Sequence, residues 1–120
     1  MTEAPLIVSV SGIRGIVGQS LTDETIQRFA DAFATWLPQA ARVVIARDTR
    51  PSGEAYGRLV STALQAAGCH VIDLGICATP VAKLMVLELK AQGALILTAS
   101  HNPTPWNGLK LIRADGIFLN

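Results

Sequence analysis

The 120-residue chain has little cysteine, few aromatic side chains and almost no net charge. Its two cysteines, Cys69 and Cys77, are too few for a disulfide framework, and with His70 they match no common zinc spacing, so we assign no metal there. A formal net charge of +1 from scattered lysines and arginines provides no basic stripe for nucleic acid. No apolar run approaches the roughly 18 residues of a membrane helix, and no signal-like segment opens the chain. We therefore expect a cytoplasmic protein that binds neither nucleic acid nor a membrane.

Apolar side chains, in contrast, make up 50% of the chain. A chain of this length suits about one domain, here residues 1–120, and is short for a complete metabolic enzyme. Either a strongly buried sheet or a surface that faces a partner or a further domain explains the apolar excess. We give the second explanation more weight and expect a single domain that is a fragment of a longer protein.

Strand-like and helix-like segments alternate along the chain. We expect strands over 6–10, 43–46, 70–74 and 93–98, and helices over 22–37, 53–67 and 81–90. Thr22 is the expected N-cap of the first helix, and Pro38 ends it. This order predicts the α/β class, as a three-layer α/β/α sandwich with a mixed, mostly parallel sheet. Ala114-Asp115-Gly116, between apolar segments, predicts a hairpin turn near the end.

Polar and cationic side chains follow the expected strands. We expect residues 11–18, with three glycines and Arg14, to form a loop, as do residues 47–53 and 75–80. Because the carboxyl ends of parallel strands share one edge, these loops should meet residues 100–102 there, with Lys110 beside them. Arginine and lysine on such an edge suit phosphate.

Two of these loops also have plain structural interpretations. For Arg47-Asp48-Thr49-Arg50 we favour an ion pair that ties the loop to a neighbouring helix over direct contact with a substrate. For Thr79-Pro80 we favour an N-cap followed by proline at the first helical position. We therefore assign neither loop a catalytic role.

Ser100 is the first candidate for chemistry, because an apolar run delivers it to a turn forced by Pro103. As a hydrolase nucleophile it would need His101 as its base, but adjacent residues rarely align in this way, and no Gly-x-Ser-x-Gly elbow is present. The glycines of residues 12–18 fit neither the dinucleotide fingerprint nor the Walker pattern. The third chemistry is phosphorylation of Ser100 and transfer of its phosphoryl group, which needs cations and usually Mg²⁺. Asp48 and Asp115 form no carboxylate cluster, so such a metal site needs completion elsewhere.

Four motifs resemble those of the α-D-phosphohexomutases, in order and over nearly the whole chain. The last is highly specific, and the others are less so. They are Ser11-Gly12-Ile13-Arg14-Gly15, Ala46-Arg47-Asp48-Thr49-Arg50-Pro51-Ser52-Gly53, Ala78-Thr79-Pro80, and Thr98-Ala99-Ser100-His101-Asn102-Pro103 followed by Asn107-Gly108-x-Lys110.

The resemblance implies the N-terminal, serine-carrying domain of a four-domain enzyme that is inactive as this fragment alone. Such an enzyme interconverts hexose 1-phosphate and hexose 6-phosphate through a bisphosphorylated sugar, with Mg²⁺ and a hexose 1,6-bisphosphate activator. Ser100 would be the phosphoserine, whose phosphate also binds Mg²⁺. His101 and Lys110 would have acid/base or positioning roles, Arg14 would lie near the phosphoryl group, and Asn102, Arg14 and Lys110 would bind substrate or phosphate.

Several alternatives stay open. Ser11 stands where several subgroups have an acidic residue, and Trp106-Asn107-Gly108 looks closer to the phosphoglucosamine mutases and the mixed phosphoglucomutase/phosphomannomutases than to animal-type phosphoglucomutases. The resemblance implies that sugar choice resides mainly in domains outside this segment, so the sequence does not name the hexose. A non-enzymatic sugar-phosphate-binding module would use the same basic edge, and a pure interaction domain would use the apolar excess.

Overall fold

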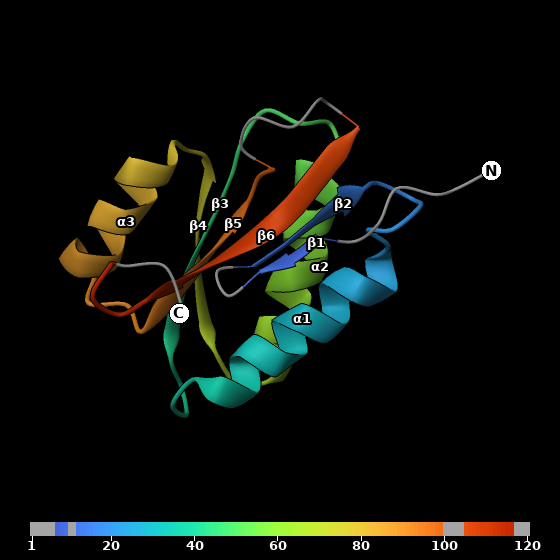
Figure 1. Ribbon diagram of the computed structural model, residues 1–120. Helices are drawn as coiled ribbons and strands as arrows, with labels where there is room; N and C mark the ends of the chain where they lie inside the picture. The colour runs from blue at the N-terminus through green and yellow to red at the C-terminus, as the bar shows by residue number, and fades with distance from the viewer. Residues whose placement is uncertain (1–6, 10–11, 100–104, 117–120) are drawn as a thin grey trace.

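The computed structural model describes residues 7–9, 12–99 and 105–116 (Figure 1). The elements, in chain order, are β1 (Ile7–Ser9), β2 (Gly12–Ile16), α1 (Asp23–Trp36), β3 (Arg42–Arg47), α2 (Gly53–Ala66), β4 (His70–Ile76), α3 (Thr79–Glu88), β5 (Gly93–Leu97) and β6 (Trp106–Arg113). None of the helices in the described part of the chain combines the length and apolar character needed to cross a bilayer.

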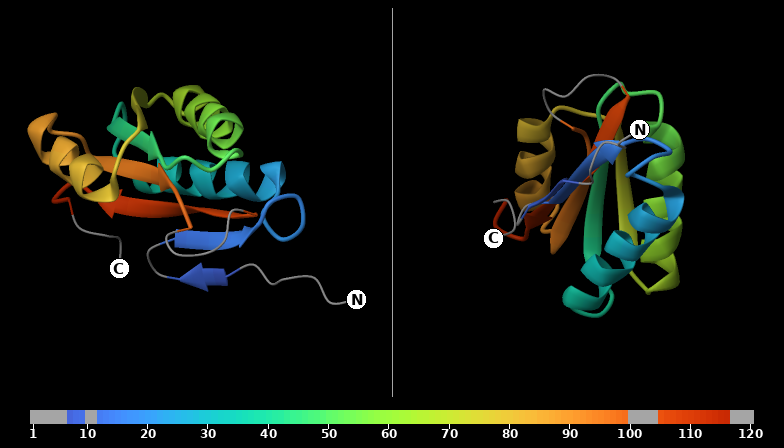
Figure 2. Two further views of the ribbon diagram at one scale, coloured as in Figure 1. Left: turned by 90° about the horizontal axis from the view of Figure 1, so that it is seen from above. Right: turned by 45° about the vertical axis from the view of Figure 1, so that its right-hand side comes forward.

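The helices lie on both faces of the sheet, with α1 and α2 on one face and α3 on the other (Figure 2, right). Successive strand residues point to opposite faces, and each face has its own core. On β3, for example, Ile45 packs in the core beneath α1 and α2, whereas Val44 packs in the core beneath α3. The three-layer α/β/α sandwich expected from the sequence is therefore confirmed.

Within the described residues, six strands form one mixed sheet in the order β1-β2-β6-β5-β3-β4. The pairings of β3 with β4 and with β5 are parallel, and those of β1 with β2, β2 with β6, and β5 with β6 are antiparallel. The mixed sheet is confirmed, but the expectation that it is mostly parallel needs correction. Helical crossovers make the β4-β3-β5 part parallel, whereas residues 98–105, which connect β5 to β6, are fewer than the dozen or more that a parallel crossover needs, and β6 returns antiparallel.

Residues 11–18, expected to form a loop, contain strand β2, and this expectation was wrong. The glycines that suggested a loop instead allow close packing. A Cβ at Gly12 would lie 1.8 Å from the Leu109 carbonyl oxygen, and one at Gly15 would lie 2.7 Å from the Ser20 Oγ. A glycine can mark a turn, but at these two positions it permits a tight approach between neighbouring segments.

The N-cap residue predicted from the sequence is correct for helix α1 but not for helix α3. Thr22 is the N-cap of α1, as expected, and its Oγ1 accepts a hydrogen bond of 3.3 Å from the Thr25 N–H. Helix α3 differs, because Ala78 is its N-cap and Thr79 already belongs to the helix. Pro80 fits this first turn because its missing N–H would have no partner within the helix.

Candidate functional site

The three residues of the expected catalytic loop, Ser100, His101 and Asn102, lie outside the described residues, but the strands on either side are described. The Thr98 N–H, just beyond β5, donates a hydrogen bond of 3.0 Å to the Gly108 carbonyl of β6. On the far side of β6, Gly108 pairs with Arg14 of β2. A row therefore runs across three neighbouring segments, from Arg14 through Gly108 to Thr98, which precedes Ser100 by two residues in the sequence.

Lys110 lies on β6 next to this row, opposite Gly12 of β2 and Ile96 of β5. Leu109 and Ile13 point into the core beneath α1 and α2, so alternation puts Lys110 and Arg14 on the other face of the sheet. The register makes them diagonal neighbours across the β2–β6 pair, a relationship that spans about 7–8 Å. The structure thus brings together two of the cations expected at the site.

The environment of Lys110 makes its ammonium group easier to deprotonate than that of an ordinary lysine. Partial burial lowers the pKa of Lys110 from its usual 10.5, and the positive charges of Arg14 and of Lys83 on α3 lower it further. A general base must be able to lose its own proton near working pH, so the shift is in the direction that proton transfer needs. Lys83 had no role in the sequence-based interpretation, because its place beside Lys110 depends on how α3 packs.

The loop between β3 and α2 meets the same edge of the sheet. Asp48 accepts two hydrogen bonds from Arg50, one from its backbone N–H and one from Nε, each of 3.0 Å. The Arg50 Nη1 also donates to the carbonyl oxygen of Trp106 at 3.1 Å, and the Asp48 N–H donates to that of Leu97 at 3.1 Å. The expected ion pair is confirmed, but it ties the loop to β6 rather than to a helix.

Asn107 belongs to the last of the four sequence motifs, but no function was predicted for it. It is fully buried, and its Nδ2 donates a 2.7 Å hydrogen bond to the Oγ of Ser52 at the start of α2. Its Oδ1 accepts a 2.9 Å hydrogen bond from the Gly108 N–H. Asn107 therefore joins the β3–α2 loop to the strand that carries Lys110.

The described residues do not by themselves make a magnesium site. No group of three His, Cys, Asp or Glu side chains occurs among them, and the carboxylate of Asp48 accepts hydrogen bonds from Arg50 with both oxygens. Mg²⁺ prefers several oxygen ligands, including one or two carboxylates. We therefore derive no chemical step through a metal from these residues.

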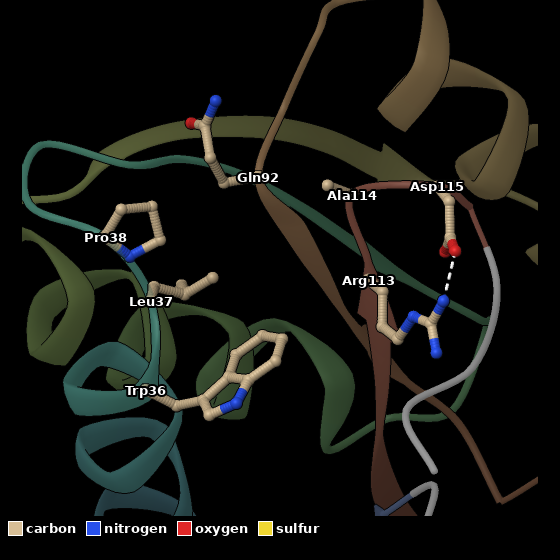
Figure 3. Close-up of a pocket in the computed structure, with 7 residues that line it drawn as sticks. All are labelled: Trp36, Leu37, Pro38, Gln92, Arg113, Ala114 and Asp115. Carbon is tan, nitrogen blue, oxygen red and sulfur yellow. Dashed lines mark hydrogen bonds and ion pairs between the residues drawn. The ribbon is translucent and has the colours of Figure 1, made fainter.

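A pocket of about 630 Å³ lies at the other end of the sheet, where β5 begins and β6 ends (Figure 3). The exposed Trp36 lines one side, and the ion-paired Arg113 and Asp115 line the other. The described site residues Arg14 and Lys110 are not part of its lining. The pocket is therefore separate from the candidate site.

Comparison with known proteins gives one consistent family. Residues 6–120 match the family described as phosphoglucomutase/phosphomannomutase, alpha/beta/alpha domain I. A phosphoglucosamine/phosphogalactosamine mutase from Sulfurisphaera tokodaii is 34% identical over 92% of this chain and 24% of its own length. A phosphoglucomutase/phosphomannomutase from Thermococcus kodakarensis is 39% identical over 90% of this chain and 25% of its own length.

A solved structure agrees with these sequence matches. The crystal structure of a protein from Thermus thermophilus, provisionally named a phosphomannomutase, superimposes with a TM-score of 0.87 at 35% identity. The match covers 96% of this chain and 27% of that one. The chain thus spans about a quarter of the length of these relatives. It belongs to the phosphoglucomutase/phosphomannomutase family, as that family's alpha/beta/alpha domain I.

Proposed function

We propose that this chain is the phosphoserine-carrying domain of a phosphohexomutase, which interconverts hexose 1-phosphate and hexose 6-phosphate. The observation that carries the proposal is the placement of Arg14 and Lys110 as diagonal neighbours on one sheet face, beside the segment that leads to Ser100. A phosphoserine carries about −1.5 to −2 charges, which two adjacent cations offset. Membership of the phosphoglucomutase/phosphomannomutase family supports the same activity.

The proposed reaction moves a phosphoryl group between Ser100 and the sugar. A sugar hydroxyl oxygen attacks the phosphorus of phosphorylated Ser100, the bond from phosphorus to the serine oxygen breaks, and the hydroxyl proton leaves to a base. In the second step the released Ser100 oxygen attacks the phosphorus of the other phosphate, the bond from that phosphorus to the sugar oxygen breaks, and the sugar oxygen takes a proton back from the base. Lys110, whose pKa is lowered, is our candidate for that base, and Arg14 would bind phosphate oxygens.

For His101 we propose an acid/base or positioning role beside the reacting groups. For Asn102 we propose phosphate binding. Mg²⁺, held in part by the phosphate of Ser100, would spread the negative charge of the transferring group. A hexose 1,6-bisphosphate activator would phosphorylate Ser100 at the start. These assignments are predictions from the family resemblance.

The partners we propose are the hexose phosphate and the further domains that the relatives' greater length implies. An apolar stripe on α3 supports the second partner, because Val81, Leu84 and Leu87 are 48%, 55% and 51% exposed. Large apolar side chains at this spacing form one face of a helix and normally pack against something. We expect the 120-residue chain alone to be inactive, and the intact enzyme to act in the cytoplasm.

The identity of the hexose is a separate proposal. The relatives include a phosphoglucosamine/phosphogalactosamine mutase and a phosphoglucomutase/phosphomannomutase at similar identity. We favour the phosphoglucomutase/phosphomannomutase reaction, with phosphoglucosamine as the alternative substrate class. Turnover of glucose 1-phosphate, mannose 1-phosphate and glucosamine 1-phosphate, compared as kcat/KM, decides between them.

Mass spectrometry on the protein from its native host tests the central step. We expect a phosphate on Ser100, and we expect Ser100→Ala to lose both that phosphate and mutase turnover while its melting midpoint changes little. Retained turnover in the variant would refute the phosphoserine. A protein that binds hexose phosphates without Mg²⁺ dependence, turnover or covalent phosphate would be a sugar-phosphate-binding module instead.

A further inference from the structure

The segment that carries Ser100 runs from the end of β5 to the start of β6, and the structure describes both of these ends. Strand β5 ends at Leu97, and just beyond it the Thr98 N–H donates to the Gly108 carbonyl of β6. Alternate carbonyls of a strand point the same way, so the Trp106 carbonyl, two residues before that of Gly108, also points to the β5 side. Because β5 has already ended there, this carbonyl needs a donor from another segment.

Asp48 and Arg50, in the loop between β3 and α2, hold both ends of the segment. The Asp48 N–H donates a 3.1 Å hydrogen bond to the Leu97 carbonyl at the first end. The Arg50 Nη1 donates a 3.1 Å hydrogen bond to the Trp106 carbonyl at the second end. The two residues are joined to each other, because the backbone N–H and the Nε of Arg50 each donate to an oxygen of the Asp48 carboxylate at 3.0 Å. The pair therefore forms a bridge between the two ends.

The chemistry of arginine makes this bridge a defined one. The Arg50 side chain is only 10% exposed, and withdrawing a cation from water is costly unless charged and polar partners hold it. A guanidinium is planar and its donors keep fixed directions, so the bond from Nε to Asp48 also directs Nη1 toward Trp106. A lysine ammonium group is a single point and does not couple the two contacts in this way.

The bridge lies at the ends of the segment whose serine would carry the phosphate. Phosphoryl transfer depends on close placement of the reacting groups, and a misplacement of about 1 Å can cost about 100-fold in rate. We propose that Arg50 is a positioning residue for this reaction. By fixing the two ends of the segment, it fixes the place of the Ser100 oxygen relative to the cations on β2 and β6, and it acts through the Trp106 backbone rather than by touching the substrate. The inference rests on the proposed function and adds to it a residue of the β3–α2 loop.

Arg50→Lys in the intact enzyme tests the inference, and Arg42→Lys is its matched control. Arg42 begins β3, at the opposite end of that strand, and its Nη1 donates a 3.1 Å hydrogen bond to the Leu89 carbonyl. Both changes thus keep the charge and replace an arginine that donates to a backbone carbonyl. We expect Arg50→Lys to lower kcat about 10- to 100-fold and to change KM by less than about threefold, because the cations on β2 and β6 stay in register. Arg42→Lys should leave both constants unchanged.

Hydrogen exchange at the Thr98 amide gives a second measurement, which does not depend on turnover. The hydrogen bond of this amide to the Gly108 carbonyl lies at the end of β5. We expect Arg50→Lys to speed its exchange about tenfold, because the neighbouring end of the segment loses its tie, and Arg42→Lys to leave it unchanged. Circular dichroism identifies a temperature at which every variant is folded, and both measurements are made there, so that unfolded protein does not account for a fall in kcat.

Asp48→Asn is the second test variant and is used if the Arg50→Lys protein does not fold. It keeps the backbone N–H that bonds to Leu97 but removes the charge that orients Arg50. We expect kcat to fall and the Thr98 amide to exchange faster, as in Arg50→Lys.

Several results would overturn the inference. An unchanged kcat or an unchanged Thr98 exchange rate in the folded test variant would do so, as would an equal fall in kcat in Arg42→Lys. A raised KM with an unchanged kcat would show that Arg50 binds the substrate instead. Absence of turnover and of phosphate on Ser100 in the wild-type enzyme would refute the proposed function itself, whereas the exchange rates would still report on the bridge.

Discussion

Asn107 and Ser52, 55 residues apart in the sequence, are joined by a 2.7 Å hydrogen bond from the Asn107 Nδ2 to the Ser52 Oγ. Ser52 is the N-cap residue of α2, yet its side chain makes no hydrogen bond to its own helix. A serine at this position ordinarily caps a backbone N–H of the first turn. Here it instead holds β6, and with it Lys110, against the β3–α2 loop.

We predict that Asn107→Ala lowers the free energy of unfolding by about 1–3 kcal/mol, because Ser52 and the Gly108 N–H lose their buried partner. Urea denaturation of the wild type, Asn107→Ala, Ser52→Ala and the double variant measures the coupling between the two residues. Strict additivity of the two single changes would contradict a direct link. Mutase activity should fall further than stability alone explains, because β6 carries Lys110.

A second prediction concerns the close approach of β2 and β6. A Cβ at Gly108 would lie 2.1 Å from the Ile13 carbonyl oxygen, which is backbone and has no rotamer to escape into. We expect Gly108→Ala to destabilise the fold by at least about 1–3 kcal/mol. Thermal denaturation measures the effect, and an unchanged melting midpoint would show that the strands can separate at low cost.

Gly57→Ala is the control for that experiment, because its Cβ would meet only the Leu97 side chain, at an ordinary 3.5 Å. Gly57 lies inside α2, where alanine is favoured over glycine by about 0.5–1 kcal/mol. This variant should therefore be more stable than the wild type. The opposite signs of the two changes separate steric blockage from the general effect of replacing glycine.

The sequence predicts elements that depend on local signals, and it fails where a residue's role depends on a distant segment. Thr22 could be predicted as a cap because the N–H that its hydroxyl caps belongs to Thr25, only three residues away. The strand position of Gly12 could not be predicted locally, because its partner strand, β6, lies nearly 100 residues further along the chain. Arg14 and Lys110 were expected at one edge of the sheet, but their diagonal placement follows from the β2–β6 register, which no local pattern encodes.

The expected roles of Ser100, His101 and Asn102 stay predictions, because these residues lie outside the described part of the chain. The loop between β3 and α2 illustrates the same division between local and long-range signals. The Asp48–Arg50 ion pair joins residues two apart and was predicted. The hydrogen bond from Arg50 to the Trp106 carbonyl spans 56 residues and was not predicted.

A third prediction tests that longer contact. Arg50→Lys replaces the planar guanidinium, which reaches Asp48 through Nε and Trp106 through Nη1, with a single ammonium group that cannot make both contacts in the same geometry. The Arg50 side chain is only 10% exposed, so we expect a loss of about 1–3 kcal/mol in the free energy of unfolding. Arg58→Lys on α2, whose bridge to Glu54 is exposed, should change it by less than about 0.5 kcal/mol. Equal urea midpoints for the two variants would contradict this prediction.

The last prediction follows from the lowered pKa of Lys110. Between that lowered value and the usual 10.5, the unfolded chain binds more protons at Lys110 than the folded protein does, so this residue makes stability rise with pH. Below both values the amine is charged in both states, and the folded protein bears the full unfavourable effect of burial and of its cationic neighbours. Lys110→Met removes that charge. The variant should therefore lose no more than about 0.5 kcal/mol of its free energy of unfolding at neutral pH, and it should lack the rise in stability with pH. Urea denaturation from about pH 7 to about pH 10.5 compares the two proteins, and a Met variant clearly less stable at neutral pH would show that the ammonium group stabilises the fold.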